Sequence, residues 1–229
     1  MISDNKLLHL LGWVVTILTT LSIIMLSVRV LINPAYARLQ YALPGFPEDP
    51  YGFTRNDRLR WSEPTIRYLV NREDINYLAE LEFEEGEPIY NQRELQHMED
   101  VKEVVIIMRL VLSGSVLLLT GATWFAVKKG QEIFLLKSFR RGAWGVIGLM
   151  VAILFFVMLN FNRLFTWFHQ MFFEAGTWLF HPSDTLIRLY PLRFWRDTFI
   201  IAGFLSLVFS IIIILFCDRQ IKSHSTQIE

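Results

Sequence analysis

The sequence predicts an all-α membrane protein, a four-transmembrane-helix bundle with an extracytoplasmic cap formed by the segment between transmembrane (TM) helices 1 and 2. The chain has 229 residues, of which 53% are hydrophobic and 19% charged, and a mean hydropathy of +0.36, which is too apolar for a soluble domain. Four apolar stretches each have about the 20 residues that a membrane-spanning helix needs. The chain between the first two stretches is too long for a bare loop and should contain structure of its own.

Each element follows from hydropathy and charge. The first apolar stretch is too long for the apolar core of a signal peptide, and NPAYARL after it is a poor cleavage site. Between the second and third stretches, KKGQEIFLLKSFRR carries five basic residues and one acid, so the positive-inside rule places this loop and both termini in the cytoplasm. The expected order is TM helix 1 at 7–32, the cap at 33–100, TM helix 2 at 101–127, a cytoplasmic basic loop at 128–141, TM helix 3 at 142–165, an outer aromatic and polar segment at 166–197, TM helix 4 at 198–216 and a cytoplasmic tail at 217–229.

Charge and motif content exclude several functional classes. The 22 basic and 22 acidic residues balance, so we expect no nucleic-acid partner and no polybasic membrane anchor. Cys217 is the only cysteine, and its place at the cytoplasmic end of TM helix 4 excludes a cysteine nucleophile at the outer face. The sequence contains no GxSxG elbow, Walker loop, HExxH motif or dinucleotide fingerprint.

Two histidines are expected at the outer face of the membrane. In ELQHMEDV, residues 94–101, Glu94, His97 and Asp100 share one helical face that leads into TM helix 2. Either acid would then hold one ring nitrogen of His97 while the other nitrogen faces a ligand. His169 follows TM helix 3 at the same outer level. The alternative reading is that both are ordinary interfacial histidines, one among surface acids and the other in an aromatic belt.

Other polar residues lie within or near the spans. Arg109 falls inside TM helix 2 and Asn160 near the outer end of TM helix 3. An ionisable residue inside a span indicates function by default, and a snorkelling arginine is the competing explanation. A zinc site is allowed by residue type but its spacing is weak, so we expect no metal and no other cofactor. The residues of that zinc alternative are His97, Asp100, His169 and His181.

Three blocks carry a resemblance to a known family: HMEDV before TM helix 2, FNRLFTWFHQMFFEAGTWLF around the end of TM helix 3, and DTLIRLYPLRFW before TM helix 4. They resemble the bacterial lipoprotein intramolecular transacylase (Lit) family and its related integral membrane proteins. The similarity covers the four-span layout and is weak over residues 33–90. It implies a multi-pass protein of the bacterial cytoplasmic (inner) membrane with two catalytic histidines under an extracytoplasmic cap. Carried over, these are His97 and His169, whereas His9 and His181 match no motif histidine.

The resemblance also implies a reaction. An acyl chain moves from the sn-2 position of a lipoprotein's diacylglyceryl cysteine to the α-amino group of the same cysteine, so the implied partners are a diacylated lipoprotein and membrane lipid. The amine, with a pKa near 8, must lose a proton and the departing glycerol oxygen must gain one. Histidine, with a pKa near 6.5, suits both roles, and either histidine is a candidate for either role. The substrate supplies both nucleophile and electrophile, which fits the absence of serine and cysteine machinery.

The remaining candidates are orienting or substrate-binding residues. The acids would fix the tautomer of His97, the polar side chains would bind ester or glycerol oxygens, and a Phe/Trp enclosure would exclude water. Two other functions stay open: a non-enzymatic membrane protein that binds lipid or lipoprotein at its outer face, and a metal-assisted lipid hydrolase. The candidate set is Glu94, Asp100, Arg109, Asn160, Trp178, Asp184, Arg188 and Tyr190.

Overall fold

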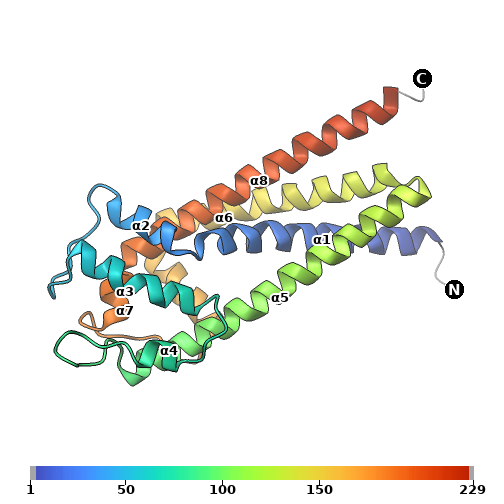
Figure 1. The fold of residues 1–229 in the computed structure, drawn as a ribbon. Coiled ribbons are helices and arrows are strands. Elements are labelled where there is room, and N and C mark those ends of the chain that lie inside the picture. The colour runs from blue at the N-terminus through green and yellow to red at the C-terminus, as the bar shows by residue number, and fades with distance from the viewer. Residues whose placement is uncertain (1–3, 227–229) are drawn as a thin grey trace. The chain divides into compact units, whose positions relative to one another are not determined.

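The computed structural model describes residues 4–226, and within them the regular structure is helical apart from one isolated bridge between Glu82 and Pro88. Four helices, α1, α5, α6 and α8, are long and apolar enough to cross a membrane, with mean hydropathies of 2.2, 2.2, 2.4 and 3.0 in their best windows. The prediction of an all-α membrane protein with four spans is therefore confirmed (Figure 1). The helices are α1 Asp4–Leu31, α2 Pro34–Ala42, α3 Arg55–Tyr68, α4 Asn76–Ala79, α5 Gln92–Lys129, α6 Glu132–Phe172, α7 Thr185–Leu189 and α8 Leu192–Thr226.

The chain forms two compact units. The bundle unit contains the chain up to Arg29, Arg109–Phe155 and the chain from Ile201 onward, and the cap unit contains Val30–Met108 and Phe156–Ile200. The long helices continue from one unit into the other, so each unit holds one part of α5, α6 and α8.

Close approach of α1 and α6 defines the core of the bundle unit. Gly142 lies so near α1 that an added Cβ would be 2.7 Å from the carbonyl oxygen of Thr16. The hydroxyl of Thr20 donates to the carbonyl of Gly142 at 3.1 Å, and that of Thr16 donates to the carbonyl of Ser138 at 3.3 Å. Small residues and hydroxyls at a helix contact are typical of membrane bundles, where lipid gives little hydrophobic driving force. The adjoining apolar cluster contains Ile23, Ala143, Val146, Met150 and Ile214.

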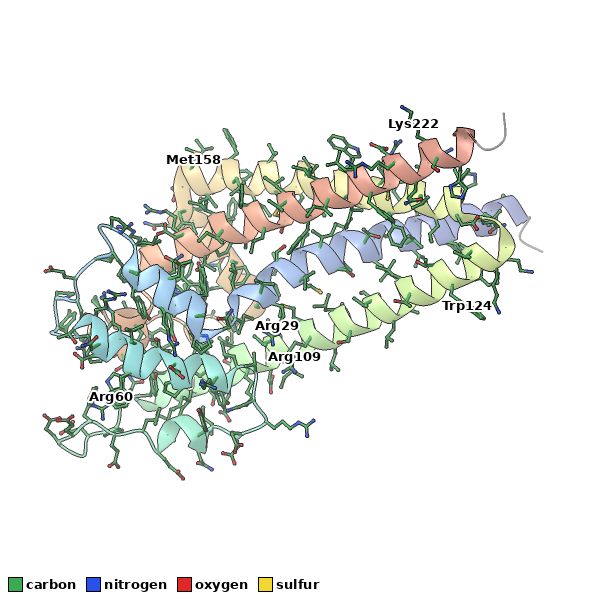
Figure 2. The ribbon with its side chains drawn as sticks, turned by 45° about the horizontal axis from the view of Figure 1, so that its top comes forward. Arg29, Arg60, Arg109, Trp124, Met158 and Lys222 are labelled. Carbon is green, nitrogen blue, oxygen red and sulfur yellow. The ribbon has the colours of Figure 1, made fainter. Side chains whose placement is uncertain are left out.

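The expected loop at 128–141 is mostly helix, which corrects that boundary. The helix α5 runs to Lys129 and α6 begins at Glu132, so only Gly130 and Gln131 separate them. Gly130 has a φ of +65°, a conformation that glycine adopts without steric cost and that ends helices. The basic residues stay helical because charge ends the membrane span but not the helix. Lys128 and Lys129 also lie in the last turn of α5, where cations are favoured. Figure 2 shows Trp124 near the last turns of α5 and Lys222 near those of α8, which continues to Thr226 through most of the expected tail.

The cap unit holds the short helices. Asn33 caps α2 through its side chain, and Thr54 and Asp57 form a capping box that starts α3. Prolines 44, 47 and 50 lie between these helices, in a segment without regular helix, because proline does not fit a helix interior. The helix α3 packs against α2, α4 and α7, as can be followed in Figure 1, and Figure 2 labels Arg60 on α3. The core of this unit is aromatic and aliphatic, with Tyr41, Trp61, Leu78, Tyr90 and Leu189 buried.

Candidate active site

His97 and His169 come together in the cap unit. His97 lies in the second turn of α5, His169 lies in the last turns of α6, and both side chains are about one-twelfth exposed. Their ring centroids are 6.2 Å apart and the ring planes differ by 21°. Two imidazoles from different helices, 72 residues apart in sequence, therefore face one small volume, which lone interfacial histidines would not require.

Aromatic side chains enclose the two imidazoles. Phe173 and Phe180 meet His97 edge-on, with centroid distances of 4.9 and 5.3 Å. Phe165 and Trp178 lie 4.0 and 4.9 Å from His169. These rings shield the imidazoles from water and surround them with apolar surface. We call His97, His169, Phe165, Phe173, Trp178 and Phe180 the aromatic pocket.

A backbone carbonyl determines the tautomer of His169. Nδ1 of His169 lies 2.9 Å from the carbonyl oxygen of Phe165, one helical turn earlier. A carbonyl only accepts, so Nδ1 carries the proton and donates. In the neutral ring Nε2 then holds the free lone pair, which makes this nitrogen a base.

Two buried polar atoms of the aromatic pocket lack a hydrogen-bond partner among residues 4–226. They are Nδ1 of His97 and Nε1 of Trp178. Buried polar atoms are nearly always paired in proteins, so each such atom needs an explanation. Neither expected acid satisfies His97, because no carboxylate in the described chain accepts from or donates to its Nδ1.

Glu94 instead joins two helices. Its side chain is 1% exposed, with Oε2 accepting the backbone N–H of Asn91 at 2.9 Å and Oε1 that of Leu186 at 2.7 Å. The first bond caps α5 and the second caps α7. The expectation that Glu94 orients the ring of His97 is therefore replaced by a role in holding α7 against the start of α5.

Asp184 strengthens the same junction. It is the N-cap residue of α7, but its side chain makes no cap hydrogen bond. Its carboxylate accepts the backbone N–H of His181 at 2.8 Å and the side-chain amide of Asn91 at 3.2 Å. The hydroxyl of Thr185 donates to the carbonyl of Ile89 at 2.7 Å. The segment 173–184, which carries Phe173, Trp178 and Phe180, is thus fixed at its far end to the helix of His97.

Three other predicted residues of the cap unit have partners other than the two histidines. The carboxylate of Asp100 accepts from Gln96 at 3.3 Å. The guanidinium of Arg188 pairs with buried Asp49 at 3.0 Å and lies 3.4 Å from the centre of the Phe53 ring. The hydroxyl of Tyr190 donates to the carbonyl of Ser62 at 3.3 Å, and burial raises the pKa of this phenol well above its ordinary value. Arg188 and Tyr190 therefore tie α7 to the cap helices.

The last two predicted residues lie on the spanning helices. Asn160 interrupts α6, with φ and ψ of −160° and 84°, and its side-chain oxygen accepts the backbone N–H of Arg163 at 3.0 Å. It thus acts as an N-cap for the stretch of α6 that carries His169. Arg109 lies on α5 with an exposed side chain.

Sequence reasoning missed the backbone carbonyl of Phe165 and the capping partners of Glu94. A pattern of side chains gives no sign of a carbonyl's role, and the pairing of Glu94 with Leu186 spans 92 positions of sequence. Within residues 4–226, no group of three or more His, Cys, Asp or Glu side chains is arranged to hold a metal ion, so the four residues of the zinc alternative are not assembled as a ligand set.

Comparison with known proteins identifies a family. A family model described as "Lipoprotein intramolecular transacylase Lit" matches residues 13–195. An uncharacterized protein of Aquifex aeolicus (strain VF5) is 30% identical over 192 residues, covering 82% of this chain and 84% of that protein.

Solved structures share the fold. The in meso structure of the membrane integral lipoprotein intramolecular transacylase Lit from Bacillus cereus is similar with a TM-score of 0.83 and 21% identity, covering 97% of this chain and 100% of that chain. A variant of that protein with a histidine replaced by arginine gives a TM-score of 0.77 at 19% identity, with coverages of 98% and 96%. Because the family model matches well over half of the sequence, the chain belongs to the lipoprotein intramolecular transacylase (Lit) family.

Proposed function

We propose that this protein is an intramolecular transacylase that moves an acyl chain from the sn-2 position of a lipoprotein diacylglyceryl cysteine to the α-amino group of that cysteine. The observation that carries the proposal is the pair of buried imidazoles, 6.2 Å apart, inside the aromatic pocket. Family membership supports the reaction class, and the substrate itself supplies the nucleophile and the ester. By the positive-inside rule, the cap unit and this site face the extracytoplasmic side and both termini face the cytoplasm.

The two histidines take different roles in this proposal. His169 is the general base, because its Nδ1 proton is engaged by the carbonyl of Phe165 and Nε2 keeps a lone pair for the proton of the amine. His97 is the general acid that protonates the departing glycerol oxygen. Two imidazolium ions at this separation repel each other, so the pair works with one extra proton rather than two. That proton arrives on the α-amine, which has a pKa near 8 and is mostly protonated at neutral pH, and it passes to His97 before the attack. After the reaction one proton remains on His169 and leaves to water.

The pocket also has a positioning role. An acyl chain packed on Phe165, Phe173 and Phe180 holds the ester near the amine, and effective molarity of this kind contributes several kcal/mol to a reaction barrier. The same rings exclude water, which would otherwise hydrolyse the ester.

The proposal is tested by mass spectrometry of a lipoprotein N-terminal peptide from bacterial cells that lack their own transacylase. Wild-type protein should give an N-acyl, mono-O-acyl cysteine. His97→Ala and His169→Ala should each lower the rate roughly 10²- to 10⁴-fold, leaving a diacylglyceryl cysteine with a free amine.

His181→Ala is the matched control. His181 lies on the exposed part of the same outer segment, and Asp184 holds its backbone N–H, which alanine retains. This variant should keep full activity. If correctly inserted wild-type protein leaves the cysteine amine of the lipoprotein free, the lipid- or lipoprotein-binding function replaces the transacylase proposal. If a chelator abolishes the activity, the metal-assisted hydrolase replaces it.

A further inference from the structure

The indole N–H of Trp178 is a buried donor without an acceptor in the described chain. Its ring centroid lies 4.9 Å from that of His169, with a tilt of 38° between the planes. The nitrogen is therefore inside the aromatic pocket, within a few ångströms of the imidazole that we assign as the base. The phenylalanine rings around it have no acceptor atoms.

An indole N–H only donates, so the group that satisfies it must be an acceptor. Of the two reacting groups of the substrate, the ester carbonyl accepts hydrogen bonds and a protonated α-amine does not. We infer that the N–H of Trp178 donates to the carbonyl oxygen of the migrating acyl group and stabilises the oxyanion that forms there, which makes Trp178 a catalytic residue. This inference rests on the proposed transacylase function.

The covalent steps show where such a donor acts. The α-amino nitrogen forms a bond to the ester carbonyl carbon, whose oxygen becomes an oxyanion, and the amine proton passes to His169. The oxyanion then collapses and the bond from the carbonyl carbon to the sn-2 glycerol oxygen breaks, with a proton from His97 going to that oxygen. No atom enters or leaves overall. A donor fixed beside His169 meets the carbonyl oxygen as its negative charge grows.

Two other polar candidates for this contact are engaged elsewhere. The guanidinium of Arg188 pairs with Asp49 and donates to the carbonyl of Tyr51 at 3.0 Å. The side-chain oxygen of Asn160 caps the second stretch of α6 by accepting the backbone N–H of Arg163 at 3.0 Å. Trp178 contacts His169 directly.

The test replaces the N–H and keeps the shape. At position 178, 3-benzothienylalanine has a bicyclic ring of nearly the same size with sulfur in place of N–H. In a detergent or vesicle assay with a synthetic diacylglyceryl-cysteine peptide, we expect this variant to lower kcat roughly 100-fold and to leave KM near the wild-type value. Trp178→Phe should lose at least as much.

A stability measurement separates catalysis from packing. Because the N–H is unpaired in the free protein, its removal should leave Tm unchanged or raise it, whereas loss of a structural hydrogen bond would lower Tm. The matched control is 3-benzothienylalanine at Trp167, an exposed tryptophan of α6 whose ring lies under the guanidinium of Arg163. This control should keep wild-type kcat.

The outcomes distinguish this inference from the proposed function. A wild-type protein that forms no N-acyl product overturns the transacylase. If the wild type is active and the benzothienyl variant keeps the wild-type kcat, only the role of the Trp178 N–H is overturned. This holds even if Trp178→Phe is inactive, because the shape of the ring rather than its N–H would then matter.

Discussion

Glu94 is a buried carboxylate that satisfies the first N–H groups of two helices at once. Replacing it by alanine leaves the backbone N–H groups of Asn91 and Leu186 without these acceptors. A buried unpaired donor costs about 1–3 kcal/mol, so we expect Glu94→Ala to lower the free energy of unfolding by roughly 2–4 kcal/mol. Thermal unfolding in detergent measures this loss, and Glu103→Ala, an exposed glutamate on the same helix, is the control. Equal Tm values for the two variants would contradict the capping role.

The two unpaired polar atoms of the aromatic pocket lower the stability of the free protein for the same physical reason. Nδ1 of His97 and Nε1 of Trp178 each reduce stability by about 1–3 kcal/mol relative to a paired group. Residues that serve a reaction are often unfavourable in the free protein, because their partner is the substrate. The junction of Glu94, Asp184 and Thr185 offsets part of this cost close by, at the start of α5 and α7.

The helix α6 is interrupted at Asn160, and this break affects where His169 lies. Asn160 ends one helical stretch, and its side-chain oxygen caps the next stretch by accepting the backbone N–H of Arg163. That second stretch carries His169, nine residues after Asn160. We expect Asn160→Ala to lose the cap, worth about 1 kcal/mol, and to shift His169. A displacement on the order of 1 Å at a catalytic group lowers rates up to about 100-fold, so activity should fall at least several-fold.

Asn160→Ser is the matched variant for this element, since serine caps helices as well as asparagine does. It should keep most of the activity in the lipoprotein peptide assay. If alanine and serine at this position gave the same rate, the cap at Asn160 would have no part in placing His169.

These elements also show what the sequence predicts and what it does not. Hydropathy predicts the four spans because the apolar runs are long. The span boundaries next to the ELQHMEDV and FHQMFF blocks also predict that His97 and His169 lie at the same outer level of the membrane. The helix ends extended past the expected boundaries, because polar residues such as Lys129 end a membrane span without ending a helix. The interruption at Asn160 and the double cap by Glu94 depend on backbone geometry and on contacts between distant segments, which residue patterns do not encode.

At the scale of the whole molecule, chain order and charge predict the orientation in the membrane. In the sequence, α2, α3 and α4 come before α5, and the turn at Gly130 follows its last residue, Lys129. Since basic residues cluster beside that turn, the cap should be extracytoplasmic. In a Cys217→Ser background, we expect Glu84→Cys in the cap to react with a membrane-impermeant maleimide in intact spheroplasts. Lys129→Cys should react only after the membrane is opened.

Both positions are exposed and outside the aromatic pocket, so neither substitution disturbs the proposed chemistry. The same two labels also test the function, because the ester and the α-amine of a secreted lipoprotein meet the enzyme on the outer side. Labelling of Lys129→Cys in intact spheroplasts, with Glu84→Cys protected, would invert the topology. The histidine pair would then face the cytoplasm, where a mature lipoprotein amine does not occur, and the transacylase proposal would fail with the orientation.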